Sequence, residues 1–313
     1  MTAALRVGLV GTGLWAREVH AAALLAHPDV EFVGVWGRDR DRARAIADPA
    51  RITAFDTVAA LLAAVEAVTI AIPPAAQAPI ALEAARAGKH VMMEKPIAVT
   101  AALADELEAA VLQRGVGSVV CFTGRWIPQF EQWLTSLAGQ DGWACGRAEI
   151  LSNAMVTTSG FETSPWRQQF GALWDLGPHG LSMLHPVLGD VESVAAIRGV
   201  NDQVHLLLRH AGEASSTLSA SMTLPPAVPP GHAYYFYGGP GRSSAPSLDG
   251  DADPTAIAYG RMLDSLVAQA RDGTRDDPRD VRLGAHVVRV LEAASTSLST
   301  GSVTPVPRPT ARR

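Results

Sequence analysis

The feature that most constrains the fold is the glycine-rich turn GTGLWA at Gly11–Ala16. A run of apolar residues precedes it and a helical stretch follows, which is the setting of a dinucleotide-binding turn. Gly11 allows the tight turn, Gly13 lets the backbone approach a pyrophosphate, and Ala16 is small enough for the helix to pack on the strand. A pyrophosphate would then lie on free N–H groups at the start of the helix. We therefore predict an α/β Rossmann domain with a doubly wound parallel sheet and with cofactor contacts from Gly11, Thr12, Gly13, Leu14 and Trp15.

The end of the second predicted strand, Glu31–Trp36, favours NADP over NAD. An NAD enzyme usually offers a carboxylate there to the ribose 2′-hydroxyl, whereas this chain has Gly37 and Arg38. A guanidinium suits a 2′-phosphate through its charge and its planar fork of donors. Asp39 leaves NAD open as the alternative, although its place before the helical run 40–47 makes it a natural N-cap.

Two further strands end in residues that would line the same crevice. The strand at 67–72 runs into two prolines, which cannot continue a ladder, so the chain must leave the sheet there. The strand at 90–93 delivers a Glu-Lys-Pro sequence to the same edge. In doubly wound sheets the cofactor lies over the carboxyl ends of the strands. Predicted cofactor contacts from these two strand ends are Ile72, Pro73, Pro74, Glu94, Lys95 and Pro96.

Lysine usage singles out Lys95 as a candidate acid or base. The chain has 26 basic residues, of which only two, Lys89 and Lys95, are lysines. Arginine replaces lysine as a charge, but its pKa is too high for proton exchange near neutrality. A lysine kept in such a chain, between Glu94 and Pro96, is therefore predicted to be functional. Lys89 stands beside Gly88 at a helix end, where a capping or surface role explains it.

A second chemically dense segment is WDLGPH at Trp174–His179. Pro178 suits the first position of a helix, which places His179 in the first turn. The positive end of a helix disfavours an imidazolium, so we predict that His179 is a neutral proton acceptor and that Asp175 orients it. A capped helix start with a polar surface histidine is the alternative interpretation.

The second half of the chain predicts an α+β domain. Strands are expected without helices between them, which favours a mostly antiparallel sheet with one covered face. We expect a first domain at 1–122 and a second at 123–313. The loops within 225–254 have no assigned role, and the aromatic stretch Tyr234–Tyr237 fits a strand, a pocket wall or a subunit interface. The expected strands are 147–155, 191–198, 203–209 and 216–224, and the expected helices are 129–137, 256–270 and 281–298.

Composition excludes several classes of function. Acidic residues outnumber basic ones by 31 to 26, a net charge of −5, which gives no electrostatic case for binding nucleic acid or an anionic membrane. Cys121 and Cys145 form no CxxC pair and match no metal spacing, so we expect no metal site and a reducing, cytoplasmic compartment. The longest apolar region, 58–72, is interrupted by Glu66 and closed by prolines, so we expect no membrane span.

In its motifs the chain resembles the Gfo/Idh/MocA family of glucose–fructose oxidoreductase, inositol dehydrogenase and rhizopine-catabolism proteins. The resemblance rests on GTGLWA, on AIPP at Ala71–Pro74, on GKHVMMEKPIA at Gly88–Ala98 and on WDLGPH. It implies that Lys95 lies beside the nicotinamide, with a cis bond to the following proline, and that Asp175 and His179 assist proton transfer. It also implies a substrate domain whose large open sheet often serves oligomerisation, and hence a homodimer or homotetramer.

The resemblance further implies a small-molecule substrate, commonly a sugar or cyclitol. Many family members carry an acidic residue three positions after this histidine, where the chain has Ser182, so polyol contacts at that position do not transfer. The substrate contacts that we predict are Arg125, Trp166, Arg167 and His179.

The predicted reaction is hydride transfer between NADP or NAD and a carbinol or carbonyl carbon, with Lys95 moving the hydroxyl proton. Two alternatives stay open. The same fold serves non-catalytic dinucleotide-binding sensors or regulators, and a reductase could deliver the hydride to an imine or a tetrapyrrole-like double bond. A regulator has no chemical need for Lys95, Asp175 and His179 together, which favours an enzyme.

Overall fold

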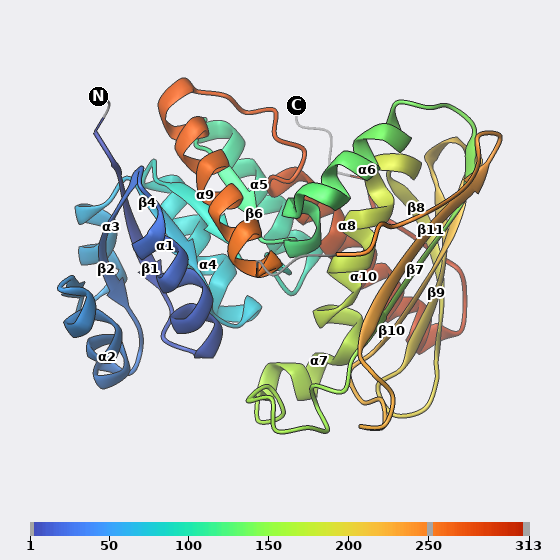
Figure 1. Ribbon diagram of the computed structural model, residues 1–313, viewed down its shortest axis with the longest axis horizontal. Helices are drawn as coiled ribbons and strands as arrows, with labels where there is room; N and C mark the ends of the chain where they lie inside the picture. The colour runs from blue at the N-terminus through green and yellow to red at the C-terminus, as the bar shows by residue number, and fades with distance from the viewer. Residues whose placement is uncertain (1–2, 249–252, 309–313) are drawn as a thin grey trace. The chain divides into compact units, whose positions relative to one another are not determined.

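The computed structural model describes residues 3–248 and 253–308 (Figure 1). Within them the chain forms two compact units. The first unit contains the chain up to Ile127 together with the described residues that run on to Ala285, and the second contains the described residues from Pro128 to Leu248 and those from His286 onwards. The sequence-based division at 122/123 did not include this return of the chain to the first unit.

The first unit is built on a six-stranded parallel sheet in the order β3-β2-β1-β4-β5-β6, which is the strand order of a Rossmann fold. The predicted doubly wound parallel sheet is therefore confirmed. Its central strands are buried on both faces, as their apolar runs predict. The strands are β1 (Leu5–Val10), β2 (Val30–Trp36), β3 (Thr53–Ala54), β4 (Ala67–Ile70), β5 (His90–Met93) and β6 (Ser118–Val120).

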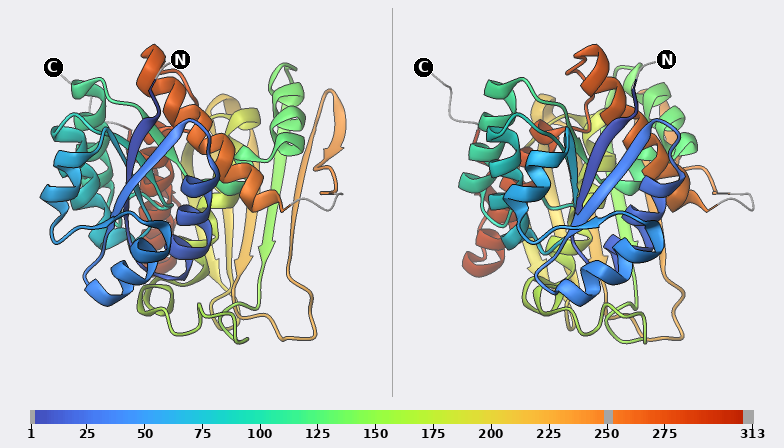
Figure 2. Two further views of the ribbon diagram at one scale, coloured as in Figure 1. Left: turned by 60° about the vertical axis from the view of Figure 1, so that its left-hand side comes forward. Right: turned by 90° about the vertical axis from the view of Figure 1, so that its left-hand side faces the viewer.

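Helices cover both faces of this sheet (Figures 1 and 2). The helix after β1 begins at Leu14, is π-helical over six residues and then continues as an α-helix. The helices of the first unit are η1 (Ala16–Ala21), α1 (Ala22–Ala26), α2 (Arg40–Ala50), α3 (Val58–Ala64), α4 (Pro74–Arg86), α5 (Ala101–Arg114), η2 (Thr123–Trp126) and α9 (Pro254–Asp272).

Two prolines set the exit from β4. The strand ends at Ile70, two residues earlier than predicted, and α4 begins at Pro74. Pro73 is extended, and Pro74 occupies the first turn of the helix, where the missing N–H costs nothing because that group has no partner within the helix. The pair therefore ends the strand and starts the helix at once.

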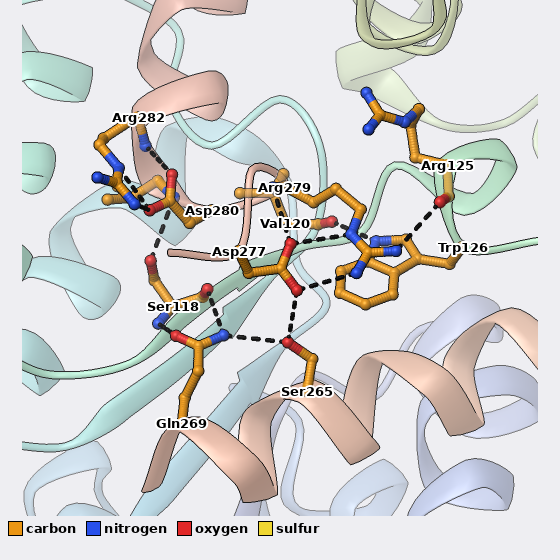
Figure 3. Close-up of polar contacts among 11 residues, drawn as sticks. Ser118, Val120, Arg125, Trp126, Ser265, Gln269, Asp277, Arg279, Asp280 and Arg282 are labelled. Atoms are coloured by element: carbon orange, nitrogen blue, oxygen red, sulfur yellow. Dashed lines mark hydrogen bonds and ion pairs between the residues drawn. The ribbon is translucent and has the colours of Figure 1, made fainter. Parts of the chain in front are cut away.

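Helix α9 brings a distant part of the sequence back to the sheet of the first unit. It lies against η1, α1, β5 and β6 (Figure 2), and its buried side chains include Tyr259, Met262 and Leu266. Helix α9, the loop after it and η2 together cover the outer edge of β6 (Figure 3). We call this arrangement the edge clasp, and its six residues are Ser118 and Val120 of β6, Trp126 of η2, Gln269 of α9, and Asp277 and Arg279 of the loop.

The edge clasp occupies backbone groups that an outermost strand would otherwise leave unpaired. The Gln269 amide accepts a hydrogen bond from the N–H of Ser118 (2.9 Å) and donates one to its carbonyl (3.2 Å). The Val120 N–H donates to the carbonyl of Arg279 (3.0 Å), and the Val120 carbonyl accepts from the Trp126 indole (3.1 Å).

An ion pair holds this loop in shape. The Arg279 guanidinium donates two hydrogen bonds to the Asp277 carboxylate, at 2.9 and 3.0 Å, and lies 3.5 Å from the centre of the Trp126 ring. The two charged side chains are only 12% and 13% exposed. Burial raises the pKa of Asp277, but the hydrogen bonds and charge of Arg279 outweigh it, so the pKa is lowered overall.

The second unit contains a seven-stranded sheet in the order β12-β11-β7-β10-β9-β8-β13. Its strand pairs are antiparallel except for β7 and β10, so the sheet is mostly antiparallel, as expected, and one parallel pair makes it mixed. The strands are β7 (Trp143–Leu151), β8 (Val191–Arg198), β9 (Val204–His210), β10 (Ser215–Ser221), β11 (Gly231–Gly238), β12 (Gly241–Ser244) and β13 (Thr304–Pro305).

The open question about Tyr234–Tyr237 is answered in part, because the stretch belongs to β11. Tyr234 and Phe236 are buried, and Tyr235 and Tyr237 point to the other face. β12, by contrast, lies among the loops that were expected within 225–254. It was missed because the glycines beside it mark a hairpin turn between β11 and β12 rather than a long irregular segment.

Helices cover one face of this sheet, and Figure 1 shows α8 lying along it. The helices of the second unit are α6 (Pro128–Ala138), α7 (Pro165–Asp175), α8 (Gly177–Leu188), η3 (Ala211–Glu213) and the larger part of α10 (Val281–Thr300). In the part of the chain that the structure describes, none of the helices has the length and apolar character needed to cross a lipid bilayer.

We expect Asp277→Asn to destabilise the first unit by about 2–3 kcal/mol, because it leaves the Arg279 guanidinium without its carboxylate in a mostly buried position. Urea unfolding followed by circular dichroism measures this loss. The matched control is Glu106→Gln, which removes an equally short but exposed ion pair with Arg86 and should change stability by no more than about 0.5 kcal/mol. Equal losses in the two variants would contradict the role of the clasp.

Candidate active site

The ends of β1, β2 and β4 meet around the glycine-rich turn. Gly11 has φ +135°, and a Cβ at this position would overlap the carbonyl oxygen of Ala71, which follows β4. The Gly11 N–H donates to the carbonyl of Trp36, the last residue of β2 (2.8 Å). A Cβ on Gly37 would overlap the side chain of Thr12. The turn, the β2 end and the β4 end therefore lie together, as the sequence predicted.

The residues around Gly13 fit a dinucleotide. An ideal Cβ on Gly13 would have no neighbouring atom within 4 Å, so open space adjoins the backbone where a pyrophosphate would have to approach. The helix that starts here presents its first N–H groups to this space. These observations concern the turn itself and do not distinguish NAD from NADP.

The ribose-reading position has an exposed arginine and a carboxylate that is already in use. Arg38 is exposed just after β2. Asp39 caps α2, because its carboxylate accepts hydrogen bonds from the N–H groups of Asp41 and Arg42, both at 3.1 Å. The predicted N-cap role of Asp39 is confirmed.

The backbone of the Glu-Lys-Pro segment is held by Gln77, a residue that the sequence analysis did not select. The Gln77 amide donates to the carbonyls of Glu94 (2.6 Å) and Pro96 (3.2 Å) and accepts from the N–H of Glu94 (3.0 Å). Gln77 is fully buried on α4. The bond between Lys95 and Pro96 is cis, as the resemblance implied.

The Glu94 side chain is the centre of a buried polar group that we call the Glu94 cluster, made of Glu94, Trp15, His20 and Tyr259. One carboxylate oxygen, Oε1, accepts hydrogen bonds from the Trp15 indole (3.0 Å), from His20 Nε2 (3.0 Å) and from the Tyr259 hydroxyl. The indole N–H also lies 2.8 Å from the Tyr259 oxygen. The sequence analysis selected neither His20 nor Tyr259, and Tyr259 gave no signal beyond its place in a helical pattern.

The environment keeps the Glu94 carboxylate charged. Burial raises the pKa of Glu94, but the hydrogen bond and charge of His20 and the charge of Lys95 outweigh it, so the pKa is lowered overall. Burial and the neighbouring Glu94 charge raise the pKa of Tyr259 well above its usual value, so its hydroxyl stays protonated and donates.

His20, Glu94 and Cys121 place one ligand atom each within 4.8 Å of one another, a grouping that could hold a metal ion. Both ring nitrogens of His20 already form hydrogen bonds, Nδ1 with Thr69 Oγ1 (2.7 Å) and Nε2 with Glu94. Burial raises the pKa of the Cys121 thiol, which disfavours the thiolate that a metal needs. We therefore interpret the group as a hydrogen-bonded cluster.

The two lysines have different surroundings. The Lys89 ammonium donates to the carbonyl of Val65 (2.9 Å), a contact that ties the end of α4 to the end of α3 and gives this lysine a structural role. Lys95 is half-buried beside Glu94, and its N–H donates to the second carboxylate oxygen, Oε2 (3.3 Å).

In the second unit, Asp175 forms an ion pair with Arg167. The Arg167 Nε donates to the carboxylate at 2.8 Å, and both side chains are largely buried. The guanidinium also lies over the rings of Phe161 (4.4 Å) and Trp166 (4.8 Å). The sequence analysis placed Arg167 and Asp175 in different roles and did not anticipate that they pair.

A break in α7 and the start of α8 set the position of His179. Gly171 interrupts α7 with φ +63°, and Leu176 alone separates α7 from α8. Pro178 lies in the first turn of α8, and His179 follows it half-buried, with its N–H donating to the carbonyl of Leu176 (3.0 Å). The predicted helix start is confirmed.

Arg125, a predicted substrate contact, lies on η2 in the first unit. Its carbonyl accepts a hydrogen bond from Arg279 (3.3 Å), and Figure 3 shows its guanidinium pointing away from the Asp277–Arg279 pair. The side chain is buried and is not part of the edge clasp.

Two families of known sequences match the chain. "Oxidoreductase family, NAD-binding Rossmann fold" matches residues 5–122, and "GFO/IDH/MocA C-terminal domain" matches residues 147–242. The trans-1,2-dihydrobenzene-1,2-diol dehydrogenase of Mus musculus is 31% identical over 240 residues, which cover 71% of this chain and 70% of the mouse protein.

Other matches agree in fold. An uncharacterized oxidoreductase of Synechocystis is 30% identical over 202 residues, 61% of this chain, but the matched part spans only 53% of that protein's length. The solved structure of levoglucosan dehydrogenase, in complex with NADH and levoglucosan, superposes with a TM-score of 0.81 at 19% identity, over 97% of this chain and 100% of that one.

We expect Gly13→Ala to weaken NADH and NADPH binding by about tenfold or more, because the added methyl group enters the space that a pyrophosphate needs. Fluorescence titration with each reduced nucleotide measures the affinity. The fold has room for this methyl group, so the melting temperature should stay near that of the wild type.

The control is Gly231→Ala, at another glycine where a Cβ would meet nothing within 4 Å. It should alter neither nucleotide affinity nor melting temperature. Unchanged binding in Gly13→Ala would show that a nucleotide, if bound, does not use this turn.

Proposed function

The chain belongs to the GFO/IDH/MocA family of oxidoreductases, and on that premise we propose that it is a nicotinamide-dependent dehydrogenase or reductase acting on a carbinol or carbonyl carbon. The observation that carries the proposal is the Glu-Lys-Pro segment at the carboxyl end of β5. Gln77 fixes the backbone of this segment. The glycine-rich turn follows β1 in the same sheet and has open space at Gly13. The segment therefore offers a lysine at the edge of the sheet where the fold family binds nucleotides.

In this proposal Lys95 transfers the hydroxyl proton. Bound nicotinamide supplies the hydride chemistry. In the oxidative direction a neutral Lys95 accepts the proton of the substrate hydroxyl through Nζ, and in the reductive direction its ammonium donates that proton to the carbonyl oxygen. His179 is proposed as a second proton acceptor and donor, and the Arg167–Asp175 pair is proposed to hold the surroundings of His179 in place.

We propose a cyclic polyol, a sugar or a related vicinal diol as the substrate. The names of two similar proteins support this class, since one acts on a cyclic trans-diol and the other is bound to levoglucosan. Arg125 and Trp166 stay proposed substrate contacts.

The open face of the second-unit sheet, which exposes Ile197 and Leu207, is proposed to join copies into a homodimer or homotetramer.

The first step is a screen of sugars, cyclitols and cyclic diols with NAD and NADP to identify a substrate. With that substrate, Lys95→Met should lower kcat by about 10³-fold and His179→Ala by about 10²-fold. The matched control is Lys89→Met, which removes the only other lysine and should leave kcat close to that of the wild type. Near-normal turnover in Lys95→Met would refute the mechanism. Tight nucleotide binding without turnover on the whole panel would instead favour a sensor or regulator.

Cofactor preference is proposed to be for NADP, because Arg38 is exposed at the end of β2 while Asp39 is used as a helix cap. Arg38→Ala should weaken NADPH binding by about tenfold or more and leave NADH binding unchanged, since only NADPH carries the 2′-phosphate. The control is Arg44→Ala, which removes an exposed arginine that lies on α2 and should not change the affinity for either nucleotide. Tighter binding of NADH than NADPH by the wild type would overturn this preference.

A further inference from the structure

Three donors from separate parts of the chain converge on one oxygen of Glu94. Trp15 belongs to the glycine-rich turn, His20 lies in the π-helix η1, and Tyr259 lies on α9. A carboxylate oxygen has about two lone-pair sites, so these three donors leave Oε1 saturated. The second oxygen, Oε2, accepts a hydrogen bond from the backbone N–H of Lys95 (3.3 Å).

The π-helix explains how two of these donors reach the same atom. Trp15 and His20 are five residues apart, which in an α-helix places side chains about 140° apart around the axis. The i→i+5 bonding of a π-helix brings positions five apart close to one side. Both side chains therefore turn toward Glu94, and π-helical turns of this kind are frequent at functional sites.

Packing fixes the cluster as well as hydrogen bonding. His20 and Tyr259 are buried, and their rings meet edge to face with centroids 4.8 Å apart. The Trp15 ring meets the Tyr259 ring in the same way at 6.2 Å. Since the Glu94 side chain is itself only 14% exposed, its carboxylate has little freedom to turn.

We propose that the Glu94 cluster positions Lys95 for proton transfer by holding the Glu94 carboxylate in one orientation. A loosened carboxylate would rotate toward the Lys95 ammonium and form a closer ion pair, which would draw the amine away from a substrate. Trp15, His20 and Tyr259 are thus positioning residues.

The cluster also links the lysine to the nucleotide turn, because Trp15 is part of both. This inference rests on the proposed function, in which that turn binds a pyrophosphate and Lys95 moves the proton. An occupant that orders the turn would fix the Trp15 indole, and through it the carboxylate beside Lys95. Trp15 therefore belongs both to the turn that is proposed to bind the nucleotide and to the cluster beside Lys95.

The test uses the fact that this chain has only two lysines. Brief labelling with acetic anhydride, followed by mass spectrometry of peptides, measures the labelling rate of Lys95 relative to Lys89, which serves as an internal reference. We expect Tyr259→Phe to lower this ratio by about threefold or more, because an amine held in a closer ion pair with Glu94 is less available for acylation. The ratio needs no substrate, so it is measured even if the proposed reaction is wrong.

The matched control is Tyr234→Phe, which removes the hydroxyl of another buried tyrosine, in the second unit, and should leave the ratio unchanged. Trp15→Phe provides a second variant with a partly exposed side chain, in case Tyr259→Phe does not fold, and it should lower the ratio in the same direction. A structural role alone would lower the melting temperature without changing the ratio. An unchanged ratio in folded Tyr259→Phe or Trp15→Phe would overturn the inference.

Nucleotide binding and turnover are measured separately on the same variants. With a substrate in hand, Tyr259→Phe should lower kcat more than it alters KM. A changed labelling ratio without any nucleotide binding in the wild type would contradict the proposed function while leaving the positioning role intact. Normal binding and turnover with an unchanged ratio would contradict the positioning role alone.

Discussion

The buried carboxylate of Glu94 is the constraint on which the first unit depends. A charge taken out of water is tolerated only when hydrogen bonds and opposite charge replace its hydration. Here the replacement comes from the turn after β1, from the following π-helix and from a helix near the end of the chain. The carboxylate therefore requires all three elements to be in place, and Gln77 fixes the backbone that carries it.

The features that the sequence predicted are those with local causes. The apolar run of β1, the glycine that must adopt φ +135° at its end and the cap that Asp39 supplies to α2 each depend on a few neighbouring residues. The Rossmann order follows from the alternation of such strands and helices. The two lysines could also be distinguished from the sequence, because Lys89 stands beside a glycine at a helix end and Lys95 stands between Glu94 and Pro96.

The features that escaped prediction depend on contacts between distant residues. Tyr259 reaches Glu94 across 165 positions, and nothing in its own helical pattern marks it as a partner. Arg167 and Asp175 pair only because Gly171 breaks the helix between them. The parallel pairing of β7 with β10 is equally invisible locally, since an alternating strand pattern fixes which face is buried but not the direction of the neighbouring strand.

The edge clasp also bears on how the protein is synthesised. The strands of the first-unit sheet leave the ribosome with the outer edge of β6 covered only by Trp126, and Gln269 and Arg279 follow only after most of the second unit has been made. At ordinary translation rates that delay is on the order of ten seconds, during which Ser118 and Val120 present free backbone groups. A nascent chain in this state is open to strand addition by another chain, so polypeptide that stops before α9 is the form most prone to aggregate.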